Sequence, residues 1–222
     1  MLKYLTKAAF VAMLAALVTG CASQAPKLDY TAFKASKPHS ILVLPPVSES
    51  TDINAGNGVL AQATYPLAEA GYYVLPVALV SETFKQNGMT IANDIQAVAP
   101  AKLRQIFGAD AALYINVTKY GVSYQVLDSE AQVTVQAKLV DLRSGAALWE
   151  GKASASSNEQ NNNNSNGLGL VGLLIQAAVK QVVNKASDAA YPVAGLANQR
   201  LLSAGGANTI LYGPRSAKYG TD

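Results

Sequence analysis

Continuous hydrophobic runs mark several positions in the first half of the chain. Ser40–Leu44 is apolar after its first residue and is followed by Pro45 and Pro46. Such a run is typical of a strand that is buried on both faces, as in parallel or mixed sheets covered by helices. Tyr72–Leu75 and Ala112–Lys119 predict two further strands.

Helical spacing fills the segments between these runs. The predicted helices lie over Val59–Ala70, Val77–Gln86 and Pro100–Phe107, with a further turn at Asp94–Val98 and a later helix at Ala194–Ser203. Gly71 and Gly108 stand where a C-cap is expected. Asn54–Gly58 is rich in turn residues and predicts a loop before the first of these helices.

The period then changes to two. Apolar and polar residues alternate without interruption over Ala131–Leu139 and again over Ala147–Ala155, with a turn at Arg143–Gly145 between them. This alternation predicts an antiparallel hairpin with one face on the core and one face in water. Ala112–Lys119 and Val122–Leu127 are expected to lie beside it.

An asparagine-rich stretch separates the hairpin from an apolar segment. Residues 156–166 predict a mobile loop, since nothing in them offsets the entropy cost of ordering. The following segment predicts a helix with a wide apolar face that includes Leu170, Leu173, Leu174 and Ala177. We favour packing of this face on its own sheet; the alternatives are an interface with a membrane, with a partner helix or with a second copy in a homodimer.

The order of elements predicts an α/β fold. A single mixed β-sheet with helices packed on it accounts for the strand–helix alternation and the later antiparallel hairpin. The expected domain spans residues 39–213 and ends in a possible edge strand at Thr209–Tyr212. A polar tail follows at 214–222, and residues 21–38 are expected to form a short tether.

The N-terminus has the three regions of an export signal. Lys3 and Lys7 precede an uncharged run, Ala8–Val18, which is too short for a transmembrane helix of about 20 residues. Val18-Thr19-Gly20-Cys21 resembles the bacterial lipobox, and Cys21 is the only cysteine in the chain. The resemblance implies cleavage of a signal peptide at residues 1–20 and acylation of Cys21 by chains such as palmitate; the alternative is a plain secretory signal.

The residues after the cysteine indicate which membrane the lipoprotein is sorted to. Inner-membrane retention signals of Gram-negative lipoproteins typically resemble Cys-Asp, whereas Ala22 and Ser23 follow Cys21 here. The resemblance therefore implies a lipid anchor in the outer membrane, on its periplasmic or surface face.

Charge argues against nucleic acid as a partner. The chain contains 17 Lys and Arg residues against 14 Asp and Glu, and loss of Lys3 and Lys7 with the signal leaves a net charge of about +1. It lacks the basic stripe that nucleic-acid binding requires. A chain with 50% hydrophobic residues and 14% charged residues is expected to fold around a core.

Residues that carry enzyme chemistry are sparse. His39 is the only histidine, so neither a zinc site nor a metal cluster is expected. Glu49 and Asp52 could form a carboxylate pair but fit solvated loop acids better. Gly56–Gly58 lacks the Lys-Ser/Thr of a phosphate loop, and the glycine pattern at 167–172 does not follow a strand. The prediction is a protein that is not an enzyme and has no cofactor.

Three sequence stretches resemble a known family. "SILVLPPVSEST", "YYVLPVALV" and "VDLRSGAALWEGKA" are similar to segments of bacterial lipoproteins of unknown function, a family that includes a neisserial surface-antigen candidate. Members are encoded beside lipoproteins resembling the curli-secretion channel. The same stretches resemble the N-terminal α/β domain of the Tol-system periplasmic protein.

The resemblance implies an accessory role in envelope secretion, transport or assembly. The expected partners are the membrane, through the lipid, and other envelope lipoproteins or a secretion channel. Two alternatives remain at this point: a binding module for a small envelope ligand, and a glycan hydrolase that uses Glu49.

Overall fold

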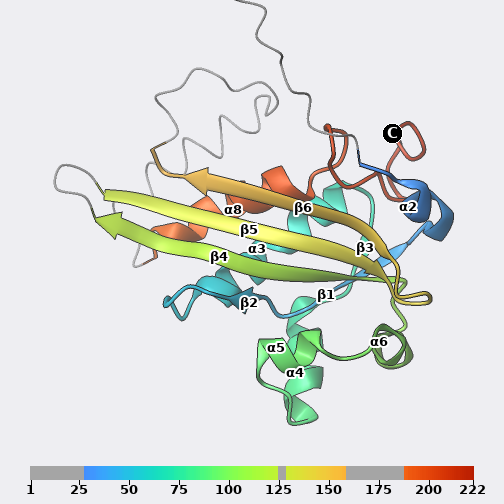
Figure 1. Cartoon of the computed structure of the whole chain (residues 1–222), viewed down its shortest axis with the longest axis horizontal. Coiled ribbons are helices and arrows are strands. Elements are labelled where there is room, and N and C mark those ends of the chain that lie inside the picture. Colours follow the sequence, from blue (N-terminus) through green and yellow to red (C-terminus); the bar gives the residue numbers. More distant parts are fainter. Residues whose placement is uncertain (1–27, 125–128, 159–187) are drawn as a thin grey trace, which may run out of the picture.

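The computed structural model describes residues 28–124, 129–158 and 188–222 (Figure 1). In chain order, the elements are α2 (Thr31–Ser36), β1 (Ser40–Val43), β2 (Val47–Ser48), α3 (Ala55–Glu69), β3 (Tyr73–Val74), α4 (Val77–Gln86), α5 (Ala92–Gln96), α6 (Pro100–Phe107), β4 (Ala111–Tyr124), β5 (Ser129–Asp141), β6 (Ala147–Ser156) and α8 (Ala190–Leu202).

The strands form one mixed sheet, which confirms the predicted fold class. Their order is β3-β1-β4-β5-β6, and β2 also pairs with β4. The pairs of β1 with β3 and β4 are parallel, whereas β4, β5 and β6 form an antiparallel meander. The sheet therefore has a short parallel half, whose strands are connected through helices, and a long antiparallel half.

β1 and β2 pair with successive parts of the same edge of β4, because two prolines separate them. β1 pairs with Ala111–Leu113 and β2 pairs with residues 116 and 117. Pro45 and Pro46 lie between them and cannot donate to the ladder. The Nε2 atom of Gln96, from α5, bridges this break by donating to the carbonyls of Pro45 and Ile115, at 3.0 Å each. The prolines thus end β1 but not the pairing along β4.

The predicted hairpin is confirmed. β5 and β6 pair from Gln132 with Ser156 to Val140 with Ala147. β4 is a single long strand where two were expected, and its register with β5 shifts between Val117 and Lys119. This bulge lets one continuous strand keep its apolar side chains on the core although the sequence pattern breaks there.

Helices cover the two faces of the sheet unequally. α3 and α8 lie behind β4, β5 and β6 in Figure 1 and form the larger core with them. On the other face, α4, α5 and α6 pack only beside the parallel half, where Leu42, Leu44 and Ala112 contact Val80, Phe84 and Leu103. The front of the antiparallel half carries no helix among the described elements.

The helix boundaries agree with the sequence pattern for α4 and α6 and differ for three others: α3, α5, which begins and ends two residues before the predicted Asp94–Val98, and α8, which begins four residues before the predicted Ala194. α4 and α6 begin and end at the predicted residues, and Gly108 closes α6 with a positive φ of 67°. α3 begins at Ala55, so the loop predicted over Asn54–Gly58 is wrong. Gly58 faces Tyr120 of β4, and a Cβ there would lie 2.6 Å from the tyrosine hydroxyl. Tertiary packing, not turn chemistry, explains this glycine.

Residues 28–38 are the described part of the predicted tether, and they pack against the domain. They include α2, whose Phe33 is only 3% exposed. The Tyr30 hydroxyl donates to the main-chain oxygen of Thr209 at 2.6 Å, and the Ser36 hydroxyl donates to Asp141. The ordered domain therefore includes these residues and does not begin at residue 39.

The C-terminal segment also differs from the prediction. Thr209–Tyr212 forms no strand. The predicted polar tail, 214–222, is folded back on the domain: Asp222 accepts a hydrogen bond from the main-chain nitrogen of Tyr212 at 2.6 Å, and the Lys34 ammonium donates to the Asp222 main-chain oxygen at 2.8 Å. Short polar segments can be held by a few such bonds even where their composition gives no sign of it.

Candidate functional site

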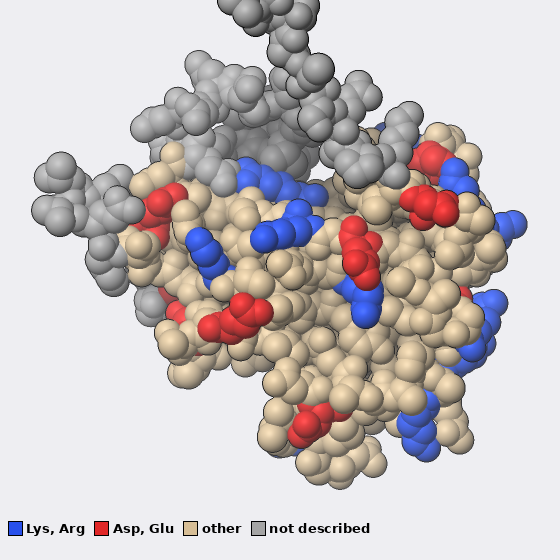
Figure 2. Space-filling view, in the orientation of Figure 1, with Lys and Arg blue, Asp and Glu red and all other residues tan. Residues whose placement is uncertain are grey.

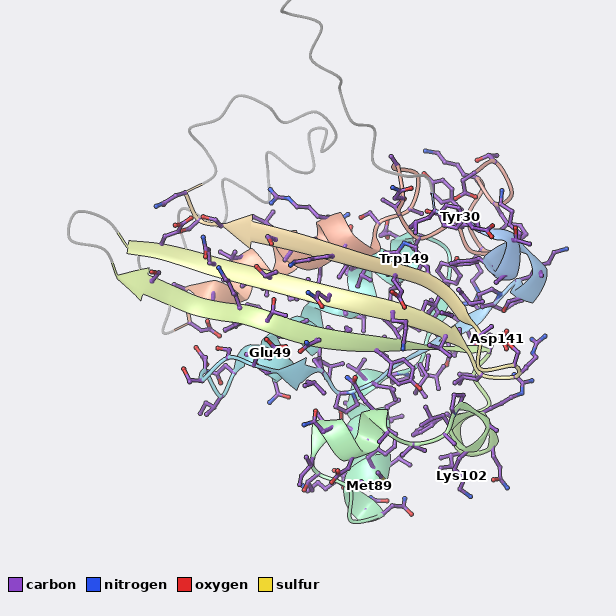
Figure 3. The ribbon with its side chains drawn as sticks, viewed as in Figure 1. Tyr30, Glu49, Met89, Lys102, Asp141 and Trp149 are labelled. Carbon is purple, nitrogen blue, oxygen red and sulfur yellow. The ribbon has the colours of Figure 1, made fainter. Side chains whose placement is uncertain are left out.

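The predicted carboxylate pair is not assembled as one. Glu49, next to β2 (Figure 3), accepts a hydrogen bond from the Asn116 amide at 2.7 Å. Asp52 instead accepts from the main-chain nitrogen of Asn54 at 2.8 Å, in the turn before α3. Each acid thus has its own local partner. This arrangement is typical of loop acids and not of a general acid–base pair, which needs both groups at one substrate position.

His39 contributes its main chain, not its ring, to the described contacts. Its backbone nitrogen donates to Asp110 at 3.1 Å, and its side chain is exposed at the start of β1. No group of three or more His, Cys, Asp or Glu residues that could hold a metal ion occurs within 28–124, 129–158 and 188–222. The hydrolase alternative therefore gains no support from the geometry around Glu49 or His39.

Asp110 is the most strongly perturbed carboxyl group that the structure describes. Partial burial by itself raises its pKa, but hydrogen bonds from Arg143, the His39 main chain and Ser40 outweigh that effect and lower the pKa to about 2. The Arg143 guanidinium donates to Asp110 Oδ1 at 2.8 Å, and Arg104 approaches the same oxygen at 3.7 Å. Asp110 thereby fastens the start of β4 to β1, to α6 and to the β5–β6 turn. Its role is structural.

Asp141 performs a similar task at the end of β5. Burial raises the pKa of this carboxyl group, but bonds from the Ser36 hydroxyl and from the main chains of Ser144 and Arg143 lower it further than burial raises it. Figure 3 shows Asp141 at the right-hand end of the sheet, far from Glu49. The described contacts of Asp110 and Asp141 therefore fix β1, α6, the β5–β6 turn and α2.

The uncovered front of the antiparallel half is the main candidate for function. We call it the open face and define it by the side chains of Tyr114, Asn116, Gln136, Lys138, Glu150 and Lys152. These residues and Gln96 line a shallow groove of about 550 Å³. Figure 2 looks onto this side of the molecule and shows acidic and basic side chains interspersed on it, without a large area of one sign.

The open face is built from cross-strand pairs. Tyr114 lies opposite Lys138, which in turn lies opposite Glu150, and the Lys138 ammonium stands 5.8 Å from the centre of the Tyr114 ring. Asn116 lies opposite Gln136. The result is a row of amides and charges of both signs. Such a row is better suited to contact the polar surface of a macromolecule than to bind a small apolar ligand.

One atom of this surface has an unmet hydrogen-bonding need. Asn116 donates to Glu49, but its Oδ1 atom is buried and accepts no hydrogen bond from any residue in the described part of the chain. A buried acceptor without a donor costs about 1–3 kcal/mol. Because this atom is buried, a partner on the open face could reach it only if the Asn116 side chain moved.

A second, smaller cavity lies between α2 and the C-terminal segment. It has a volume of about 260 Å³ and is bounded by the rings of Phe33, Tyr72, Tyr212 and Tyr219, with Lys34 and Lys37 nearby. The Tyr72 hydroxyl already donates to the Leu211 main chain at 2.7 Å. This pocket is more apolar than the open face and could enclose only a small molecule.

The predicted lipidation and interface residues stay predictions. Cys21 and the residues Leu170, Leu173, Leu174 and Ala177 lie outside the described residues, as do the signal peptide, the glycine pattern at 167–172 and residues 159–166 of the asparagine-rich stretch. None of the helices that the structure does describe is long and apolar enough to cross a membrane.

Sequence reasoning missed the open face as a site, although part of the signal was present. Gln136, Lys138, Glu150 and Lys152 are polar positions of the alternating hairpin, so their exposure followed from the pattern. Asn116 lies within the predicted strand Ala112–Lys119, whose faces were not assigned to core or solvent. The absence of a covering helix depends on where α4, α5 and α6 pack, which no local pattern reveals.

Known proteins resemble this chain over most of its length. A family model described as "Putative lipoprotein GNA1162-like" matches residues 28–215. A protein of Neisseria meningitidis serogroup B named "Putative lipoprotein NMB1124/NMB1162" is 54% identical over 192 residues, which cover 86% of this chain and 87% of that protein.

Two solved structures are similar to this chain to different degrees. The crystal structure of lipoprotein GNA1162 from Neisseria meningitidis superposes with a TM-score of 0.54 and 57% identity over 67% of this chain and all of that one. The solution structure of LpoB from Escherichia coli gives a TM-score of 0.39 and 16% identity, over 62% of this chain and 75% of that one. Both neisserial proteins are named as lipoproteins, and neither name describes an enzyme.

Proposed function

Because the chain belongs to the GNA1162-like family of lipoproteins, we propose that it is a lipid-anchored, non-catalytic accessory component of an envelope secretion, transport or assembly system. In this proposal it faces the periplasm from the outer membrane and acts by protein–protein contact. The observation that carries the proposal is the open face, a polar surface on a rigid sheet with no covering helix in the described structure.

The anchor is the first part of this proposal. The lipobox-like Val18–Cys21 and the absence of Asp after Cys21 support acylation and outer-membrane sorting. More than one acyl chain is needed for stable attachment, since a single chain binds a membrane only marginally. Mass spectrometry of the mature protein should find an acylated Cys21 as the first residue. A Cys21→Ser variant that remained embedded in the membrane would contradict this.

Contact through the open face is the second part. Its side chains carry charges of both signs and can form hydrogen bonds, and strands β4, β5 and β6 hold their positions. A partner would therefore bind a preformed surface, with little loss of conformational entropy.

A photo-cross-linking residue tests the contact in native membranes. Placed at Gln136, in the groove, it should yield an adduct of defined mass with another envelope protein. The matched control is Lys85 on α4, which is also exposed but lies away from the open face and should yield none. Adducts that form equally at both positions, or at neither, would overturn contact through this surface.

The alternative function is a binding module for a small envelope ligand. The cavity between α2 and the C-terminal segment favours it, although its volume of about 260 Å³ is below the range of about 300–1,000 Å³ that is usual for ligand sites. Native mass spectrometry of the protein extracted from membranes should then show a stoichiometric small adduct that a Leu211→Trp substitution, which fills the cavity, removes. A spectrum with protein alone favours the accessory role.

A further inference from the structure

Among the described strands, β6 forms an outer edge of the sheet, and no other strand pairs with its outward main-chain groups. In the pairing of β5 with β6, the Ser157 nitrogen donates to the Ala131 oxygen at 2.9 Å, so the odd-numbered residues of β6 bond toward β5. The Ser154 oxygen points the other way and accepts from Arg200 at 2.7 Å. By the same alternation, the N–H and C=O groups of Glu150 and Lys152 face away from the sheet.

The side chains of these two residues carry opposite charges. Glu150 and Lys152 are both exposed and stand two positions apart on the open face, with Gly151 between them. If a second β6 pairs antiparallel with the first about a two-fold axis at Gly151, each Glu150 lies opposite the Lys152 of the other copy. Residues opposite one another in such a pair exchange both main-chain bonds, so the contact would contain four of them.

From this self-complementary edge we propose that β6 is the interface for a second copy of this chain, paired antiparallel about Gly151. The sheet then continues from one copy into the other, and two open faces join into one surface. The contact is isologous, because the same residues serve both sides. It rests on the edge of β6 and does not depend on the function proposed above.

The charges select this register over its neighbours. A two-fold axis moved to residue 150 places Glu150 opposite itself, and an axis at residue 152 places Lys152 opposite itself. Like charges directly opposite on a sheet destabilise the pair, whereas opposite charges contribute roughly 0.2–1 kcal/mol. A peptide of another protein would need its own Lys and Glu in reverse order to match this edge as well as a second copy does.

The Ser154–Arg200 bond limits the length of the ladder. Because the Ser154 oxygen is already paired, regular bonding beyond the central pairs is restricted on that side. A contact of this size buries less surface than the roughly 1,200–2,000 Å² of stable complexes, so the dimer should dissociate on dilution. The opposing expectation is that the charges protect the edge from pairing, as lysines do on many edge strands. That expectation predicts a monomer.

Zero-length cross-linking tests the register directly. Full-length protein in detergent micelles is prepared in labelled and unlabelled isotopic forms, mixed in equal amounts and treated with a carbodiimide, which joins a carboxylate to an amine in contact. A peptide that links Glu150 of one isotopic form to Lys152 of the other is the expected product. Cross-links found only within one isotopic form would overturn the proposal.

Charge reversal provides the second test. Glu150→Lys and Lys152→Glu should each lower the dimer fraction, measured by light scattering of the same micelles, because like charges then lie opposite. The double variant restores opposite charges and should restore the dimer fraction. The matched control is the exposed pair Glu82 and Lys85 on α4, whose reversal should change nothing. A double variant as dissociated as the single ones, with unchanged circular dichroism, would overturn the interface.

Discussion

Neighbouring residues of β4, β5 and β6 face opposite sides of the sheet, and the two sides meet different surroundings. Leu113, Ile115 and Leu139 point to the covered face, where α3 and α8 bury them almost completely. Tyr114 and Lys138, one position away, point to the open face. The strands are the same, so the comparison separates side chains that hold the fold from side chains that are available to a partner.

The comparison teaches that stability and recognition are divided between alternate positions. The covered face is apolar and closely packed, and every substitution there is felt by the whole domain. No helix within the described part of the chain packs on the open face, so its composition is free to serve binding. Substitutions on one face should change unfolding, and substitutions on the other should change contacts.

The largest expected effect is a truncation on the covered face. Leu139→Ala removes a side chain with 0% exposure and should lower the free energy of unfolding by about 2–5 kcal/mol, since a cavity remains among β5, α8 and the strands beside it. Lys138→Ala, on the adjacent open-face position, should cost at most about 1 kcal/mol. Urea unfolding measures both. Equal losses would mean that the open face is covered as well.

A smaller effect is expected where α3 crosses β4. Gly58→Ala should destabilise by about 1–3 kcal/mol, although alanine favours helices over glycine, because its Cβ would lie 2.6 Å from the Tyr120 hydroxyl. That hydroxyl donates to Asp188 at 2.7 Å. In a double-mutant cycle with Tyr120→Phe, the combined loss should be less than the sum. Strict additivity would show that the two residues are not in contact.

Next in size is the carboxyl group that ties the parallel half to the hairpin turn. The pKa of Asp110 is about 2 in the fold against 3.8 when unperturbed. A lowered pKa adds stability above pH 4, and that stability disappears as the pH falls toward 2. Asp110→Asn should therefore cost about 1–2 kcal/mol near neutral pH and flatten the acid limb of the stability curve. Urea titrations at several pH values provide the measurement; an unchanged acid limb would contradict this account.

The smallest effect on stability should come from the groove. Gln136→Lys adds length and charge to the open face and should change the free energy of unfolding by no more than about 0.5 kcal/mol. It should nevertheless reduce the yield of photo-adducts formed in native membranes from a neighbouring groove position such as Lys138. A variant that folds normally and keeps full adduct yield would place the contact outside the groove.

Much of the fold follows from local pattern. The hairpin was predictable because alternation over Ala131–Leu139 and Ala147–Ala155 fixes both strand type and facing. α4 and α6 were predictable because proline or glycine stands at their ends. These signals act within a few residues, so a single sequence contains them.

What the sequence pattern missed depends on distant contacts. The start of α3 was hidden because Gly56 and Gly58 suggest a turn until Tyr120 is placed beside them. α2 was hidden because its only deeply buried side chain is Phe33. For the candidate site, the polar positions of the hairpin were readable, whereas the lack of a covering helix in front of them was not.

The position of β1 has a mechanical consequence. The chain enters the described domain through α2 and then passes at once into β1, which lies between β3 and β4 in the sheet. A pull on residue 28 would first load the bonds from Tyr30 to Thr209 and from Ser36 to Asp141. Beyond them, the force would have to shear β1 from two neighbours at once instead of peeling a strand from an edge. A domain connected in this way resists tension applied at its N-terminus better than tension applied at its last strand.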